Sequence, residues 1–111
     1  MPSAQNVPFR LPQELQQPYK AHVTFTHTNT GNTAETAATI STNMEEANKV
    51  ALIVDTYDAY IAFDETATSS KMLVPAGTGY FDENIVIKNY ISIINASTGN
   101  NSRIRGIAWG R

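Results

Sequence analysis

Turn-forming residues recur along this chain and divide most of it into segments too short for ordinary helices. From residue 21 onward, clusters of Gly, Asn, Asp, Ser and Pro return roughly every 8–12 residues. The segments between these clusters lack the 3.6-residue apolar period of a helix and are rich in β-branched and aromatic residues. This spacing predicts about eight short strands, at residues 21–28, 36–42, 50–54, 59–63, 71–74, 84–88, 90–95 and 103–109.

The densest apolar segment, residues 50–63, is divided at its middle by two aspartates. Apolar residues occupy both faces of the two strands on either side, as expected inside a sandwich. Residues 55–58 have the composition of a turn, so we expect the segment to form a buried β-hairpin. In this interpretation Asp55 and Asp58 are turn residues and not a catalytic acid pair.

Two further hairpins are predicted from loop composition. The strands at 21–28 and 36–42 are separated by an Asn- and Gly-rich turn, and those at 90–95 and 103–109 by a loop rich in Asn, Ser and Gly. Each pair is expected to form an antiparallel hairpin. Together these pairs predict an all-β chain, folded as a single small β-sandwich of about eight short antiparallel strands.

The first 20 residues differ from the rest of the chain. Their four prolines remove backbone donors and push the preceding residues toward extended geometry. We expect an extended Pro-rich N-terminal arm at residues 1–20 that docks on a neighbouring subunit, followed by a sandwich domain at residues 21–111. The alternative is a disordered tail. The apolar residues of the arm that would make inter-subunit contacts are Val7, Phe9, Leu11, Leu15 and Tyr19.

The composition argues against several kinds of partner. The chain has 111 residues and a net charge of −2, so it suits one modest core and has no field that would bind it to nucleic acid or to an anionic membrane. It contains no cysteine, which excludes disulfides and thiolate zinc sites. The first 20 residues lack the apolar core of a signal peptide, and no later run is long enough to span a membrane. We therefore expect a soluble, unsecreted protein.

No arrangement of residues predicts a catalytic or metal site. His22 and His27 are five positions apart in one strand and therefore point to opposite faces. The acidic pairs at 45–46, 64–65 and 82–83 lack the spacing of a calcium loop, and we interpret them as turn and solubility residues. We expect no cofactor and no enzymatic activity.

The C-terminal strand combines arginine and tryptophan with an alternating pattern. Arg103, Arg105, Ile107 and Trp109 share one face of this strand. Because Arg and Trp are enriched at protein interfaces, Arg103, Arg105 and Trp109 are candidate inter-subunit contacts. The alternative is that Trp109 closes the core and that the arginines extend into solvent.

Two short motifs in the second half of the chain are informative as a pair. They are DAYIAF at residues 58–63 and MLVPAG at residues 72–77, separated by a Ser-containing loop and followed by a terminal hydrophobic strand. In these features residues 50–111 resemble small virion proteins of tailed bacteriophages. The resemblance implies a non-catalytic β-sandwich subunit, repeated in a symmetric shell, neck or tail.

From this resemblance the expected function is a head decoration or cement protein that binds and stabilises capsid subunits. Its partners would be other virion proteins and copies of itself in a homo-oligomer, and its location the virion, assembled in the host cytoplasm. A head–tail connector or a tail component is the alternative within this class.

A carbohydrate-binding β-sandwich is the alternative from another class. Tyr57, Tyr60, Tyr80 and Trp109 could serve as stacking platforms for sugar rings. Exposed aromatic residues beside acidic loops would favour this function.

Overall fold

A computed structural model describes residues 20–111, and the structural description below concerns these residues. They form eight β-strands, and no helix occurs among them. Most of the apolar segments of the sequence coincide with a strand. The strands are β1 (Ala21–Thr28), β2 (Glu35–Thr39), β3 (Ala47–Asp55), β4 (Ala59–Phe63), β5 (Met72–Val74), β6 (Thr78–Asp82), β7 (Tyr90–Asn95) and β8 (Arg103–Gly110).

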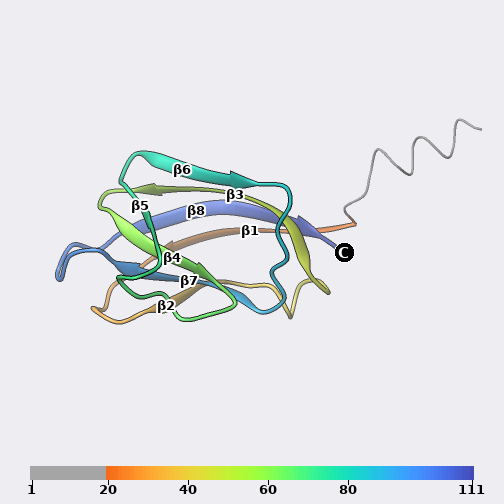
Figure 1. The fold of residues 1–111 in the computed structure, drawn as a ribbon, viewed down its shortest axis with the longest axis horizontal. Coiled ribbons are helices and arrows are strands. Elements are labelled where there is room, and N and C mark those ends of the chain that lie inside the picture. The colour runs from red at the N-terminus through yellow and green to blue at the C-terminus, as the bar shows by residue number, and fades with distance from the viewer. Residues whose placement is uncertain (1–19) are drawn as a thin grey trace, which may run out of the picture.

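The strands form two four-stranded sheets. Sheet A has the order β1-β8-β3-β6 and sheet B the order β2-β7-β4-β5, with every pairing antiparallel. Figure 1 shows the two sheets as stacked layers. This order is the jelly roll, a sandwich of two Greek keys in which most neighbouring strands are distant in sequence. The predicted all-β sandwich is therefore confirmed.

The three predicted hairpins are wrong. β1 and β2 lie in different sheets, as do β3 and β4, and β7 and β8. Their loops cross from one sheet to the other. Loop composition does not distinguish the two cases, because Gly, Asn and Asp permit a chain reversal wherever the next strand lies. Among the described strands, only β4 and β5 are both consecutive in sequence and adjacent in a sheet.

The region between β5 and β7 also differs from prediction. Residues 78–82 are absent from the predicted strands, yet they form β6 at the edge of sheet A. A Cβ atom at Gly79 would lie 2.6 Å from the carbonyl oxygen of Leu52, so the glycine allows β6 to approach β3 closely. Residues 84–88, predicted as a strand, contribute only an isolated bridge between Ile87 and Ala47.

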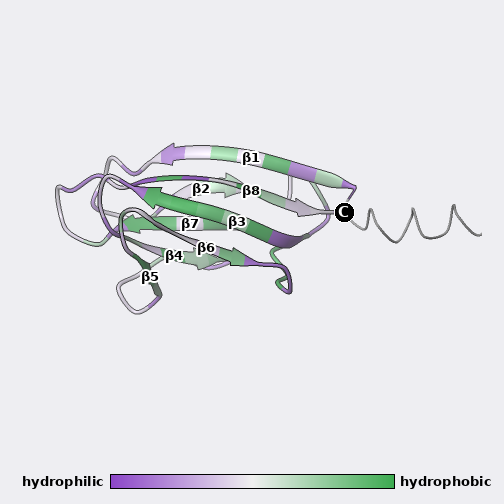
Figure 2. Cartoon of the chain, turned by 90° about the horizontal axis from the view of Figure 1, so that it is seen from above, coloured by the Kyte–Doolittle hydropathy of each residue, from purple (hydrophilic) through white to green (hydrophobic). Residues whose placement is uncertain are grey.

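The core lies between the two sheets and consists mainly of aliphatic side chains. The inward positions of β3 are Val50, Leu52 and Val54, and β3 is hydrophobic over most of its length in Figure 2. Full burial of a side chain of this size stabilises the fold by about 1.5–3 kcal/mol. The largest fully buried apolar side chains are Ile40, Ile61, Ile87, Ile91, Ile93, Ile104, Val50 and Val54.

An aspartate after β4 fixes the start of β7. Asp64 has a positive φ of 59°, and its carboxylate accepts hydrogen bonds from the N–H groups of Lys88, Asn89 and Tyr90 at 2.7, 2.6 and 3.1 Å. The N–H of Asp64 donates to the Tyr90 carbonyl at 2.8 Å. These hydrogen bonds tie the end of β4 to the start of β7. The two strands are adjacent in sheet B but are not joined by a hairpin turn.

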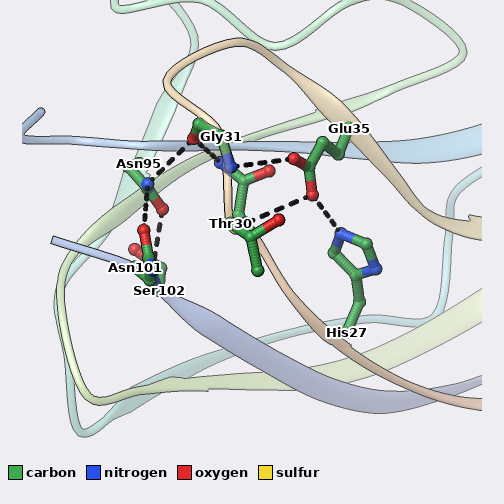
Figure 3. A network of polar contacts seen from close by, with 8 residues as sticks. His27, Thr30, Gly31, Glu35, Asn95, Asn101 and Ser102 are labelled. Atoms are coloured by element: carbon green, nitrogen blue, oxygen red, sulfur yellow. Dashed lines mark hydrogen bonds and ion pairs between the residues drawn. The ribbon is translucent and has the colours of Figure 1, made fainter. Parts of the chain in front are cut away.

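A second polar network joins the β1-β2 loop to the start of β8 (Figure 3). Asn95 Nδ2 donates to the Gly31 carbonyl at 3.1 Å, and Asn95 Oδ1 accepts from the Ser102 N–H at 2.9 Å. Glu35 accepts from His27 Nε2 at 2.8 Å and from the Gly31 N–H at 3.0 Å. Burial raises the pKa of Glu35, but the hydrogen bonds from His27 and the backbone outweigh it and hold the pKa below its ordinary value of 4.5. The network fixes the loops at one end of the sandwich.

Candidate interaction surface

The face of sheet A that points away from sheet B, called the outer face below, gathers the candidate residues of several strands. Alternate residues of β1, β3 and β8 point away from the core, and the strand registers bring them into rows across the sheet. The outer face carries His22, Thr24, Thr26 and Thr28 from β1; Arg103, Arg105, Ile107 and Trp109 from β8; Lys49, Ala51, Ile53 and Asp55 from β3; and Gly79 and Phe81 from β6.

The centre of the outer face is apolar, and we call Ala51, Ile53, Phe81 and Ile107 the apolar patch. Ile107 and Phe81 lie on either side of Ala51 in one row. Ile53 is 47% exposed and Phe81 56% exposed. An open depression of about 680 Å³ lies here, with Gly79 and Arg105 also in its lining. Large exposed apolar side chains that share one rigid sheet mark a binding surface more often than isolated ones do.

A lysine spans the two aromatic rings at one end of the outer face. Lys49 Nζ lies 4.7 Å from the centre of the Trp109 ring and 5.5 Å from that of Phe81. Both distances are within the range of cation–π attraction. Trp109 is half-buried on the outer face, whereas its neighbours Ala108 and Gly110 point inward. The tryptophan therefore does not close the core, which was one of its two expected roles.

The opposite end of the outer face is a cluster of two arginines on one aspartate. Arg103 binds the Asp55 carboxylate with Nε at 2.9 Å and Nη2 at 3.2 Å, and Arg105 Nη2 binds the same group at 2.9 Å. The hydrogen bond from Arg103 is the main cause that holds the pKa of Asp55 below its ordinary value of 3.8, and Arg105 adds to it. The two guanidinium groups are thus held in place before any partner binds.

The apolar residues predicted as contacts in the arm, Val7, Phe9, Leu11, Leu15 and Tyr19, lie outside the described residues. The described chain begins at Lys20, whose N–H donates to the Gly110 carbonyl at 2.8 Å. In the adjacent row of the sheet, His22 lies opposite Trp109. Lys20 therefore lies beside the aromatic end of the outer face, and this is where the predicted arm would join the described chain.

Phe81, Ile53 and Lys49 belong to the outer face but were not among the residues predicted to make contacts. Ile53 was interpreted as buried because both faces of its strand are apolar in sequence. Lys49 indicates that Ile53 is exposed. In an alternating strand Lys49 shares a face with Ala51 and Ile53, and a face that carries a lysine points to solvent. No comparable signal was available for Phe81, because its strand was not predicted.

A smaller polar pocket lies where the β3-β4, β5-β6 and β7-β8 loops meet. Tyr57 is 48% exposed there, and the preceding Thr56 has a positive φ of 71°. The Asp58 carboxylate accepts a hydrogen bond from the Ala76 N–H at 2.7 Å, which ties two of the loops together. The pocket has a volume of about 170 Å³ and is lined by Thr56, Tyr57, Asp58, Ala76, Ser97 and Asn100.

The histidines lie apart in the structure. His22 is on the outer face, and His27 is directed inward to Glu35. Within residues 20–111, no three His, Cys, Asp or Glu side chains gather closely enough to hold a metal ion. No helix in this part of the chain is long and apolar enough to cross a membrane.

Comparison with protein-family models and with curated proteins finds no match. Among solved structures, the chain is similar to hydroxypropylphosphonic acid epoxidase from S. wedmorenis in complex with fosfomycin, at 12% identity and a TM-score of 0.51, over 78% of this chain and 43% of the epoxidase chain. An iron(II) HppE–substrate complex matches at 12% identity and 0.51, over 81% of this chain and 52% of the other. The chain thus spans about half the length of these proteins.

Two other solved structures are matched over more of their own length, with lower TM-scores. A cupin superfamily protein from Desulfitobacterium hafniense matches at 8% identity and 0.48, over 97% of this chain and 94% of that one. A capsid structure of Helicobacter pylori bacteriophage KHP30 matches at 14% identity and 0.39, over 82% of this chain and 89% of that one. At such identities the likeness to the epoxidase concerns the fold alone.

The expectation that this chain has no enzymatic activity must be corrected. It rested on a small β-sandwich without a catalytic motif, and the same fold carries an epoxidase. The iron of the HppE complex is not carried over to this chain, because within residues 20–111 no three His, Cys, Asp or Glu side chains gather closely enough to hold a metal ion. We therefore assign no step of that reaction to residues of this chain.

Proposed function

We propose that this chain is a structural subunit of a bacteriophage particle, a decoration or cement protein that binds other virion proteins through its outer face. The observation that carries the proposal is the apolar patch, in which Phe81 and Ile53 are about half exposed on a rigid sheet. The motifs at residues 58–63 and 72–77 support the phage assignment through their resemblance to virion proteins. Jelly rolls also serve as viral capsid domains, which is compatible with this function.

The outer face has the composition of a protein interface. An aromatic and aliphatic centre lies between Trp109 with Lys49 at one end and the arginines of Asp55 at the other. Burial of the centre supplies affinity, and the charged ends supply orientation. Binding across a junction between capsid subunits stabilises the assembled particle, because the protein binds the assembled state and not the separate parts.

The head–tail connector or tail component is the alternative within this class. The outer face is compatible with a position on the head and with one in the neck or tail, because a contact surface does not determine where in the particle the protein is bound. Imaging of labelled protein on intact particles separates these positions.

Co-sedimentation with phage particles made without this protein tests the proposal. Wild-type protein should pellet with the particles, and Phe81→Ser should weaken binding by about tenfold or more, as expected for a half-exposed aromatic contact. Val86→Ser is the matched control, because Val86 is 55% exposed but lies outside sheets A and B. Equal binding of both variants, or no binding of wild type, contradicts the proposal.

A carbohydrate-binding module is a second candidate, favoured by the polar pocket at the loops. Of the aromatic residues predicted as platforms, Tyr57 alone is about half exposed, and it lies beside an acidic residue, Asp58. Tyr80 instead packs against Phe63 with ring centres 5.8 Å apart, and its hydroxyl donates to Asp82 at 2.7 Å. Protein that ignores particles but is retained on immobilised glycans, and loses this retention on Tyr57→Ala, would favour the second candidate.

A further inference from the structure

The proposed function does not name the virion protein that covers the outer face. A stretch of apolar residues with no assigned contact precedes Lys20, which lies beside this face. Sheet B covers only the inner face of sheet A, so the apolar patch stays exposed in the described chain. Residues 7–15 read VPFRLPQEL. We propose that residues 7–15 of a neighbouring copy bind the outer face, so that adjacent subunits are linked by their arms. This inference rests on the proposed function and names the partner of the same surface.

The sequence of this segment suits an apolar sheet face. In an extended chain Val7, Phe9 and Leu11 share one side, while Pro8, Arg10 and Pro12 share the other. The faces of a sheet present side chains and no free backbone groups, so a segment that lacks N–H donors at its prolines loses no pairing there. Pro-rich segments are commonly bound by aromatic-lined surfaces, and Trp109 and Phe81 provide such a surface.

The point of attachment favours a neighbouring copy over the same chain. The Lys20 N–H donates to the Gly110 carbonyl, so pairing with β8 continues one residue before β1, and an extended continuation from Lys20 would lead beyond the end of the sheet. A return over its own outer face would need a reversal close to residues 16–19. These residues contain no Gly or Asn, and Pro18 pushes Gln17 toward extended geometry.

The length of the arm is sufficient for exchange between adjacent subunits. At about 3.3 Å per extended residue, the chain from Leu11 to Lys20 spans about 30 Å. An eight-residue strand such as β1 measures about 26 Å by the same rise. An arm can therefore cross from the end of one sandwich to the outer face of another that lies beside it. On a particle surface this link would raise the effective concentration of each subunit for its neighbours.

The test uses the full chain and measures self-association by sedimentation velocity over a range of concentrations. Wild-type protein should associate, and the double variant Phe9→Ser/Leu11→Ser in the arm should associate at least about tenfold more weakly. Ile53→Ser on the outer face should have a similar effect. Leu73→Ser is the control, because Leu73 has the same 47% exposure as Ile53 but lies on β5 in sheet B. Circular dichroism establishes that each variant is folded.

A second measurement does not depend on the folding of any variant. Trp109 is the one tryptophan of the sequence and lies on the outer face, so its fluorescence reports on occupation of that face. A synthetic peptide of residues 5–16, which contains no tryptophan, should dissociate wild-type oligomers by binding the outer face in place of the neighbour's segment. The Trp109 fluorescence should then stay that of an occupied outer face. The same peptide with serine at positions 9 and 11 should do neither.

The outcomes separate this inference from the proposed function. Wild-type protein that stays monomeric and does not respond to the peptide overturns the inference, as does association that is equal in wild type and in the Phe9→Ser/Leu11→Ser variant. If the inference fails while Phe81→Ser still weakens binding to particles, the proposed function stands with another occupant. Self-association through the arm without any binding to particles overturns the proposed function and retains the inference.

Discussion

Asp55 organises one end of the outer face through a single carboxylate. It lies at the end of β3, and both of its oxygens accept hydrogen bonds from arginines of β8. The sequence predicted a turn residue at this position, because Asp55 begins the segment DTYD, whose composition is typical of turns. Its partners are 48 and 50 residues away, so only the pairing of β3 with β8 reveals them. The aspartate thus has an electrostatic role in addition to its place at the strand end.

This arrangement predicts a specific dependence of stability on pH. Because the arginines hold the pKa of Asp55 below 3.8, the unfolded state binds more protons than the folded state in this acidic range. The stabilisation is therefore present above pH 4 or so and is lost as the pH falls through the lowered pKa. Asp55→Asn should be less stable than wild type at pH 7, with a difference that shrinks below about pH 4.

Urea denaturation at pH 7, 5 and 3 checks this prediction. Glu65→Gln is a suitable control, because Glu65, paired with Lys71 at 2.8 Å, has a more exposed side chain than Asp55, 55% against 25%, and surface pairs contribute little. A difference between wild type and Asp55→Asn that stays constant from pH 7 to pH 3 would contradict the role given to the arginines.

At the scale of elements, strand positions could be predicted from the sequence but strand partners could not. Alternation and turn residues predicted 21–28, 59–63 and 90–95 with the bounds of β1, β4 and β7. Partners depend on contacts between distant segments, and a loop of Asn and Gly has the same composition whether it turns within a sheet or crosses to the other. β6 was not predicted, because glycine lowers the strand propensity of its segment. In the structure Gly79 instead allows β6 to pair closely with β3.

The candidate surface was predictable to a similar extent. Alternation in the C-terminal strand placed Arg103, Arg105 and Trp109 on one face, which is the face they share in the structure. Ile53 and Phe81 come from strands that flank each other through long-range pairing. Their meeting on the outer face follows from the jelly-roll order and not from any local pattern.

Gly106 in β8 lies where the central strands of sheet A pack closely, so a substitution there tests how tightly they pack. A Cβ atom at this position would lie 2.5 Å from the Ala51 carbonyl oxygen and 2.8 Å from Cζ of Phe25. Since β8 lies between β1 and β3, neither neighbour can move without disturbing the sheet. Gly106→Ala should therefore destabilise the protein by about 1–3 kcal/mol, the usual cost of overpacking.

Thermal or urea denaturation measures this effect. Gly99→Ala is the comparison, because a Cβ atom there meets nothing within 4 Å and only the positive φ of 84° opposes the substitution. Its expected cost is about 1 kcal/mol. A Gly106→Ala variant as stable as wild type would show that β8 can shift within sheet A.

At the scale of the whole molecule, the two faces of sheet A have different roles. The inner face builds the core with sheet B, and the outer face presents aromatic, aliphatic and paired charged residues on a rigid support. We propose that function lies in the outer face and in the predicted arm, with the polar pocket at the loops as a separate site. The jelly roll holds the outer face and the polar pocket in fixed positions relative to one another.

Photo-cross-linking on assembled particles shows whether the outer face is the contact surface of this protein. A benzophenone amino acid at position 81 lies on the outer face, and the same group at position 86 is similarly exposed but lies outside the sheets. We expect efficient cross-links from position 81 to a virion protein, with residues 7–15 of another copy among the products, and few from position 86. Cross-links that are absent from position 81, or equal at both positions, would contradict the claim that the outer face is the contact surface.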